Sequence, residues 1–152
     1  MPKSYKIVLG ADHAGYELKE ILKKELSKMG AVINDFSPTY IAGDDYPPVA
    51  KQVAHLIAND PTQLGILICG TGLGMDIAAN RIRGARAVVV RDTKDAVLSR
   101  EHNHANILIL GGRITPPSKA KAVLRAWLQA TPSKAARHLR RIDQLDASST
   151  NA

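Results

Sequence analysis

The sequence predicts an α/β fold, a three-layer, Rossmann-like sandwich in which helices cover both faces of a five-stranded, mostly parallel sheet. Apolar and amphipathic runs alternate five times, which is typical of strand–helix units. One run, residues 64–69, is almost continuously apolar, as expected for a strand buried on both faces. The chain has 152 residues, 45% of them hydrophobic, which suits a single core. We therefore expect one domain over residues 1–146 and a disordered tail over 147–152.

The first part of the chain predicts two strands and two helices. Residues 5–10 form an apolar run and predict a strand. Residues 16–29 predict a helix, because five apolar residues recur there at helical spacing: Leu18, Ile21, Leu22, Leu26 and Met29. Gly30 ends this helix, and residues 31–36 predict the second strand. Residues 47–58 predict a helix with Pro47 in its first turn and Asp44 or Asp45 as its N-cap.

The second part repeats the pattern. The strand at 64–69 leads into a glycine-rich loop, 70–74, and a short helix, 75–82. Residues 85–90 and 106–110 predict strands, and the helix between them covers residues 93–101, capped by Asp92 or Thr93. Residues 116–129 predict a helix with an apolar stripe. Ser133 is the expected cap of a last helix that ends near Leu145.

The net charge of +7 is concentrated in the last third of the chain. No acidic residue occurs between Glu101 and Asp143, whereas eight basic residues do. This asymmetry indicates an anionic partner: a nucleic acid, a phosphorylated metabolite or an acidic surface.

The single cysteine, Cys69, suits a reducing compartment. No run approaches the ~20 apolar residues of a membrane span, and the start resembles no signal peptide, so we expect a cytoplasmic protein without membrane partners.

In doubly wound α/β sheets, ligands bind beyond the carboxyl ends of the strands. Asp12 and His13 follow the first predicted strand, and Arg113 follows the last. We therefore treat these three residues as candidate site residues. The alternative for Asp12 is a cap of the next helix, and for His13 a place in a surface loop.

Cys69 precedes the loop Gly70-Thr71-Gly72-Leu73-Gly74. Three alternating glycines can aim several N–H groups at one point, so the loop predicts an anion-binding nest whose field favours a thiolate at Cys69. The alternative is a buried structural cysteine followed by a flexible turn. The loop is neither a P-loop nor a dinucleotide fingerprint, because Met75 and Asp76 follow it.

A second polar group lies nearer the C-terminus. His102 suits proton transfer near neutral pH, with a helix C-cap as the alternative. His104 lies two residues further on, and without a third ligand nearby this pair predicts no metal site. Arg137 and Arg141 are four apart on a predicted helix and could clamp a phosphate, with a solvated helix face as the alternative.

These segments together resemble the type B ribose-5-phosphate isomerases, a sugar-phosphate isomerase family that includes galactose-6-phosphate and allose-6-phosphate isomerases. The resemblance covers residues 5–145. It rests on six segments in order: 10–15, 45–47, 69–74 with 77–80, 99–103, 111–113, and Arg137-His138-x-x-Arg141. It implies interconversion of ribose 5-phosphate and ribulose 5-phosphate without cofactor or metal, and a 6-phosphohexose remains an alternative substrate. It also implies a homodimer with shared active sites, and it leaves a tetramer open.

The resemblance also implies a role for each site residue. Cys69 would be the base that moves a proton through a cis-enediolate, stabilised by Thr71 and the loop N–H groups, including those of Gly70, Gly72 and Gly74. Asp12 and a partner subunit's residue equivalent to His102 would open the sugar ring. Tyr46 and Asn103 would line the sugar. The phosphate would contact His13, Arg113, Arg137, His138 and Arg141, whereas the residues alone would have placed it on the glycine loop.

Two positions depart from the family pattern. His104 stands where the family usually has a small polar residue such as Asn or Asp, and residues 131–136 lack the family's common Gly-Gly.

A different class of protein, a basic nucleic-acid-binding module, would also explain the positive charge of the last third of the chain. The chain lacks the aromatic platform of such modules, since Phe36 is its only Phe, and it lacks a recognition-helix signature. We therefore expect no nucleic-acid partner.

Overall fold

The computed structural model describes residues 3–147, which contain one five-stranded parallel sheet in the order β2-β1-β3-β5-β4. The strands are β1 (Lys6–Ala11), β2 (Val32–Asp35), β3 (Gln63–Cys69), β4 (Ala87–Val89) and β5 (Ile107–Gly111). The helices are α1 (Tyr16–Lys28), α2 (Tyr46–Asn59), α3 (Leu73–Ala79), α4 (Thr93–Asn103), α5 (Pro117–Gln129) and α6 (Ala136–Asp146). The order places β1, β3 and β5 side by side in the middle of the sheet.

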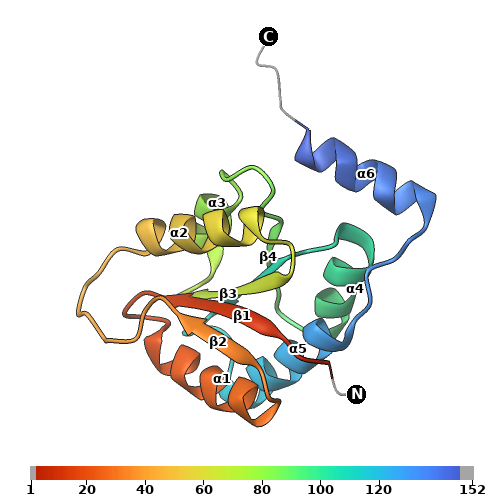
Figure 1. Ribbon diagram of the computed structural model, residues 1–152. Helices are drawn as coiled ribbons and strands as arrows, with labels where there is room; N and C mark the ends of the chain where they lie inside the picture. The colour runs from red at the N-terminus through yellow and green to blue at the C-terminus, as the bar shows by residue number, and fades with distance from the viewer. Residues whose placement is uncertain (1–2, 148–152) are drawn as a thin grey trace.

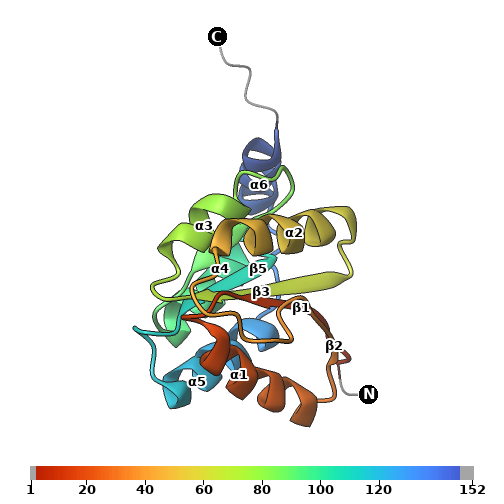
Figure 2. The ribbon, with the colours of Figure 1, turned by 90° about the vertical axis from the view of Figure 1, so that its left-hand side faces the viewer.

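Helices cover both faces of the sheet, as Figures 1 and 2 show. Helices α1 and α5 pack on one face, and α2 and α3 pack on the other. Helix α4 packs against α5, and α6 packs on α4 at the edge of the molecule. The predicted three-layer α/β sandwich is therefore confirmed.

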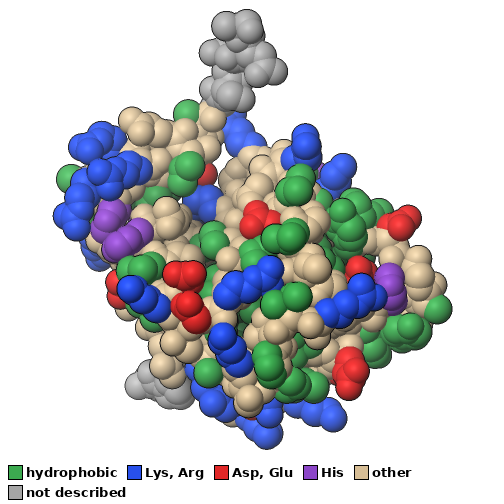
Figure 3. Space-filling model, turned by 180° about the vertical axis from the view of Figure 1, so that it is seen from behind, with side chains coloured by type: hydrophobic (Ala, Val, Ile, Leu, Met, Phe, Trp, Pro, Cys, Tyr) green, Lys and Arg blue, Asp and Glu red, His purple; other side chains and the backbone are tan. Residues whose placement is uncertain are grey.

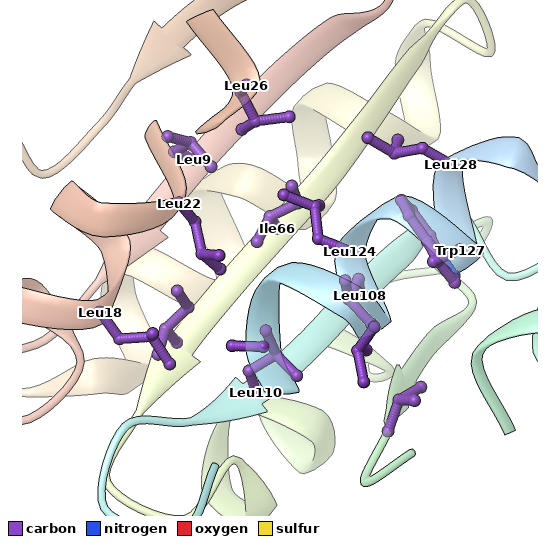
Figure 4. Close-up of a cluster of buried hydrophobic side chains, with 14 of the residues drawn as sticks. Leu9, Leu18, Leu22, Leu26, Ile66, Leu108, Leu110, Leu124, Trp127 and Leu128 are labelled. Atoms are coloured by element: carbon purple, nitrogen blue, oxygen red, sulfur yellow. The ribbon is translucent and has the colours of Figure 1, made fainter. Parts of the chain in front are cut away.

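The core consists of two layers because successive side chains of a strand point to opposite faces of the sheet. In β3, Ile66 and Ile68 join the buried cluster beneath α1 and α5, whose leucines and Trp127 are shown in Figure 4. Leu67 and Cys69 join the cluster beneath α2 and α3. Both faces of this strand are buried, which explains why its sequence is almost continuously apolar. The same alternation places Cys69 on the α2–α3 side.

Several predicted boundaries shift. Helix α3 begins at Leu73 rather than residue 75, because Gly72 has φ of 85° and ends the loop just before it. Strand β4 is three residues long instead of six, since it pairs only with β5 at the sheet edge. Asp45 is the N-cap of α2 by position, but its side chain makes no capping hydrogen bond.

The start and end of the last helix also differ from expectation. Ala135, not Ser133, is the N-cap of α6, and the Ser133 hydroxyl accepts a hydrogen bond from the Ala135 N–H at 3.1 Å. Most of the predicted tail, residues 148–152, lies outside the described residues.

Helix α6 is the most peripheral element. Its buried side chains are His138 and Ile142, while Leu139 is 42% exposed and Leu145 62% exposed. Figure 3 shows basic and histidine side chains gathered over this projecting helix. Within residues 3–147, no helix has the length and apolar character to cross a membrane.

Candidate active site

Three loops meet at the carboxyl edge of the sheet, because β1, β3 and β5 are neighbours. The Gly112 N–H donates to the Cys69 carbonyl at 2.7 Å, and the Arg113 N–H donates to the Gly70 carbonyl at 2.9 Å. The Asp12 N–H reaches the Ile68 carbonyl at 3.3 Å. These bonds continue the sheet ladder beyond the strands and hold the three loops in a fixed arrangement.

The loops and the start of α2 line an open cavity of about 250 Å³. Eight of the predicted site residues line it: Asp12, His13, Tyr46, Cys69, Gly70, Thr71, Gly74 and Arg113. They come from four separate segments of the sequence. The structure therefore brings together the thiol, the carboxylate, one imidazole and one guanidinium that the strand ends predicted.

Cys69 lines this cavity and is 4% exposed. Its Sγ accepts a hydrogen bond from the Gly72 N–H at 3.1 Å, a contact that also stabilises negative charge on sulfur. Among residues 3–147, the N–H groups of Gly70 and Thr71 have no hydrogen-bond acceptor. Two free N–H donors beside a thiol can bind an oxygen of a molecule that reacts with that thiol.

Glycines at two positions of the loop allow other side chains to approach closely. A Cβ on Gly74 would overlap the ring of Tyr46, and a Cβ on Gly70 would lie 3.1 Å from Nη1 of Arg113. Both side chains therefore lie against loop backbone that only glycine leaves open. Close approach of these side chains explains the glycines at positions 70 and 74. The third glycine, Gly72, has a positive φ, which glycine adopts more easily than other residues.

His13 is oriented by a residue that sequence reasoning did not place in the site. The His13 N–H donates to Oδ1 of Asp44 at 2.6 Å, and its Nδ1 lies 3.2 Å from the same oxygen. The sequence predicted Asp44 only as an alternative helix cap. Adjacent acidic residues before a helix gave no signal of this long-range contact.

Asp12 is 6% exposed, and its Oδ1 accepts a hydrogen bond from the Gly15 N–H at 3.0 Å. Gly15 is the N-cap of α1, so the carboxylate does help to start that helix, as the alternative interpretation proposed. Asp12 also lines the cavity. One carboxylate oxygen thus fixes the group while the residue remains part of the site.

Apart from Gly72, which donates to Cys69, the other predicted site residues form a second group on α4 and α6. The rings of His102 and His138 lie 4.5 Å apart, with an angle of 34° between their planes. Arg137 and Arg141 are exposed on α6 beside His138. Asn103 lines a different cavity, of about 390 Å³. None of these five residues lines the Cys69 cavity of the same chain.

His138 is buried, and its Nδ1 has no hydrogen-bond partner among the described residues. Burial lowers the pKa of His138 below its usual 6.5, and the positive charge of Arg137 lowers it further. A neutral His138 is therefore favoured at pH 7, which lets it stack on His102 without charge repulsion. Within residues 3–147, no three His, Cys, Asp or Glu side chains are grouped as metal ligands.

A thiol, a carboxylate and an imidazole at the carboxyl edge of an open parallel sheet define a class: α/β enzymes that act on small polar molecules. The sequence profile described as Ribose/Galactose Isomerase matches residues 7–145, so the chain belongs to this family. A relative, ribose-5-phosphate isomerase B of Mycobacterium tuberculosis, is 42% identical over 141 residues, covering 92% of this chain and 87% of the relative.

Two further relatives bear on the site. The D-erythrulose-4-phosphate isomerase of Pectobacterium atrosepticum is 41% identical over 128 residues, covering 82% of each chain. The solved structure of ribose-5-phosphate isomerase B from Mycoplasma genitalium contains bound ribulose 5-phosphate. It is 38% identical, with a TM-score of 0.88, and the match covers 93% of this chain and 94% of that one. The fold is thus shared over nearly the whole described chain.

Proposed function

We propose that this chain is an aldose–ketose isomerase that interconverts ribose 5-phosphate and ribulose 5-phosphate. The names of the relatives support the substrate, and so does the ligand of the Mycoplasma structure. The observation that carries the chemistry is the Cys69 thiol, which lines the cavity and accepts from the Gly72 N–H. The N–H groups of Gly70 and Thr71, in the same loop, have no acceptor within residues 3–147.

Cys69 acts as the base. Its thiolate takes the proton from C2 of the open-chain aldose, and the electron pair of that C–H bond forms the double bond of a cis-enediolate. The thiol then returns the proton to C1, and a proton moves from O2 to O1, which gives the ketose. The carbonyl of the substrate acidifies the neighbouring C–H, so the residues present are sufficient for this step.

The glycine loop stabilises the intermediate. Negative charge develops on the sugar oxygen during proton removal, and the N–H groups of Gly70 and Thr71, which have no acceptor in the described part of the chain, can bind it. Donors fixed in the backbone need no rearrangement as this charge appears, which makes them effective. Asp12 opens the furanose ring together with His102, by general acid–base transfer.

The active site is completed by a second copy of the chain. His102, Asn103, Arg137, His138 and Arg141 lie apart from the Cys69 cavity of their own chain. Helix α6 projects from the domain with Leu139 and Leu145 exposed, which suits burial against another protein surface (Figure 1). A symmetric dimer would place α4 and α6 of each subunit over the Cys69 cavity of the other.

The phosphate binds between His13 and Arg113 of one subunit and Arg137, His138 and Arg141 of the other. Guanidinium groups suit a phosphate dianion, because each can form two parallel hydrogen bonds. Tyr46 and Asn103 flank the sugar. The basic C-terminal third is thus explained in part by a small phosphorylated substrate. A thiol as the catalytic base suits a reducing compartment, so we place the protein in the cytoplasm.

Substrate preference tests this assignment. The values of kcat/KM should be compared for ribose 5-phosphate, D-erythrulose 4-phosphate, allose 6-phosphate and galactose 6-phosphate. We expect ribose 5-phosphate to exceed each of the others at least about tenfold, the discrimination that one carbon unit usually provides. A higher value for either hexose phosphate or for the tetrulose phosphate would replace the proposed substrate and leave the chemistry unchanged.

A further inference from the structure

Helix α6 is attached to the rest of its chain by few contacts, although the proposed function needs its arginines accurately placed. Only His138 and Ile142 of this helix are buried. The segment before it, residues 130–135, has no helix or strand. The packing of α6 alone is therefore too small to fix where the helix starts.

His104 provides an anchor for that start. It follows α4 with φ of 47° and ψ of 43°, and it is the only non-glycine residue with positive φ in the part of the chain that the structure describes. Its Nε2 lies 2.7 Å from the carbonyl oxygen of Ser133. Because a carbonyl only accepts, His104 carries a proton on Nε2. The Ser133 N–H donates in turn to the Glu101 carbonyl at 3.0 Å.

The far end of α6 is tied to the same residue. Arg86 donates from Nε to the carbonyl of His104 at 3.1 Å and from Nη1 to Oδ2 of Asp146 at 2.7 Å. His104 therefore binds the segment before α6 through its ring and the end of α6 through Arg86. His104 thus takes part in hydrogen bonds at both ends of α6, and Arg83 adds one at the far end, from its Nε to the Asp146 carbonyl at 3.0 Å.

We propose that His104 is a positioning residue, which sets α6 against α4 so that His138 and its neighbouring arginines stand beside His102. This inference rests on the proposed function. The imidazole of His104 is directed at the Ser133 carbonyl, so we assign its effect to the position of α6 and not to contact with the substrate. Its effect should therefore fall on phosphate binding and leave the proton-transfer step unaltered.

The left-handed backbone of His104 supports a specific role for its ring. Asn adopts this conformation more readily than most residues, so Asn would be the less strained choice here. The Asn side chain is too short to reach Ser133, whereas the imidazole reaches it at 2.7 Å. His104 thus gains a long-range hydrogen bond at a position where a shorter residue suits the backbone better.

Two substitutions separate the hydrogen bond from the backbone conformation. His104→Asn keeps a favourable left-handed residue and removes the bond, and we expect KM for ribose 5-phosphate to rise about fivefold with kcat within about twofold, as for loss of one hydrogen bond. His104→Gln places an amide N–H near the position of Nε2, and we expect KM close to that of the unmodified protein. His55→Asn, on an exposed position of α2, is the matched control.

Amide hydrogen exchange provides a readout that does not need turnover. In His104→Asn, exchange across residues 136–146 should accelerate severalfold, while exchange in β3 stays unchanged. An unchanged KM together with unchanged exchange in α6 would overturn the positioning role. So would equal losses in His104→Asn and His104→Gln. If the unmodified protein fails to turn over ribose 5-phosphate, the proposed function is wrong, and the exchange data alone then decide whether His104 holds α6.

Discussion

Cys69→Ala should lower kcat for ribose 5-phosphate by at least about 1,000-fold, within the range that a positioned acid or base contributes. The substitution removes the group that we propose takes the C2 proton, and it leaves the Gly72 N–H without its acceptor. A stopped or coupled assay of ribulose 5-phosphate formation measures the loss.

The control for this result is a measurement that shows that Cys69→Ala is still folded. Cys69 belongs to the buried cluster beneath α2 and α3, so Ala at this position should cost only about 1 kcal/mol of unfolding free energy. Thermal unfolding and circular dichroism should therefore show a folded variant. Because Cys69 is the only cysteine, alkylation should inactivate the unmodified protein, with substrate giving protection. Full turnover by Cys69→Ala would contradict the mechanism.

The double variant R137A/R141A should raise KM for ribose 5-phosphate by at least about 100-fold while kcat changes far less. In our proposal each guanidinium supplies charge-assisted hydrogen bonds to the phosphate, and the loss of such bonds typically costs about 1.5–3 kcal/mol, where 1.4 kcal/mol is tenfold in affinity. The phosphate is remote from the reacting carbons, so binding should suffer more than proton transfer. Initial rates over a wide substrate range separate the two constants.

Arg140→Ala is the matched control for this pair. Arg140 is exposed on the same helix, and our assignment gives it no contact with substrate. Removing its charge should change KM less than about threefold, since long-range effects of exposed charges are screened by salt. An equal rise in KM for Arg140→Ala would show that α6 attracts the substrate by general charge and does not clamp its phosphate.

The fold was predictable because most elements carry their own signal. Burial of β3 on both faces requires an apolar run, and that run is visible in residues 64–69. The edge strand β4 pairs with one neighbour only, so its short ladder ends before the apolar residues do. Helix α6 was predictable as a helix, but its place was not, because few of its side chains pack within the chain.

The site was predictable where chemistry follows directly from strand ends. Cys69 ends a strand, Asp12 and Arg113 come shortly after one, and the parallel sheet brings the three residues to one edge. Asp44 and His104 were not assigned because their partners, His13 and Ser133, are 31 and 29 residues away. Such contacts depend on how the loops fold back onto distant parts of the chain, so they cannot be predicted from the pattern of neighbouring residues.

The central claim is that each active site combines Cys69 of one subunit with α6 of another, and subunit complementation tests it directly. Cys69→Ala and R137A/R141A chains, carrying different affinity tags, should be co-expressed and purified through both tags. One site of each mixed dimer would then hold an intact Cys69 and intact arginines, while the other would lack both.

At a substrate concentration well below the KM of R137A/R141A, each parent alone should be nearly inactive. The mixed dimer should recover about half of the activity of the unmodified dimer, since one of its two sites is complete. A doubly tagged dimer no more active than its parents would contradict the shared site.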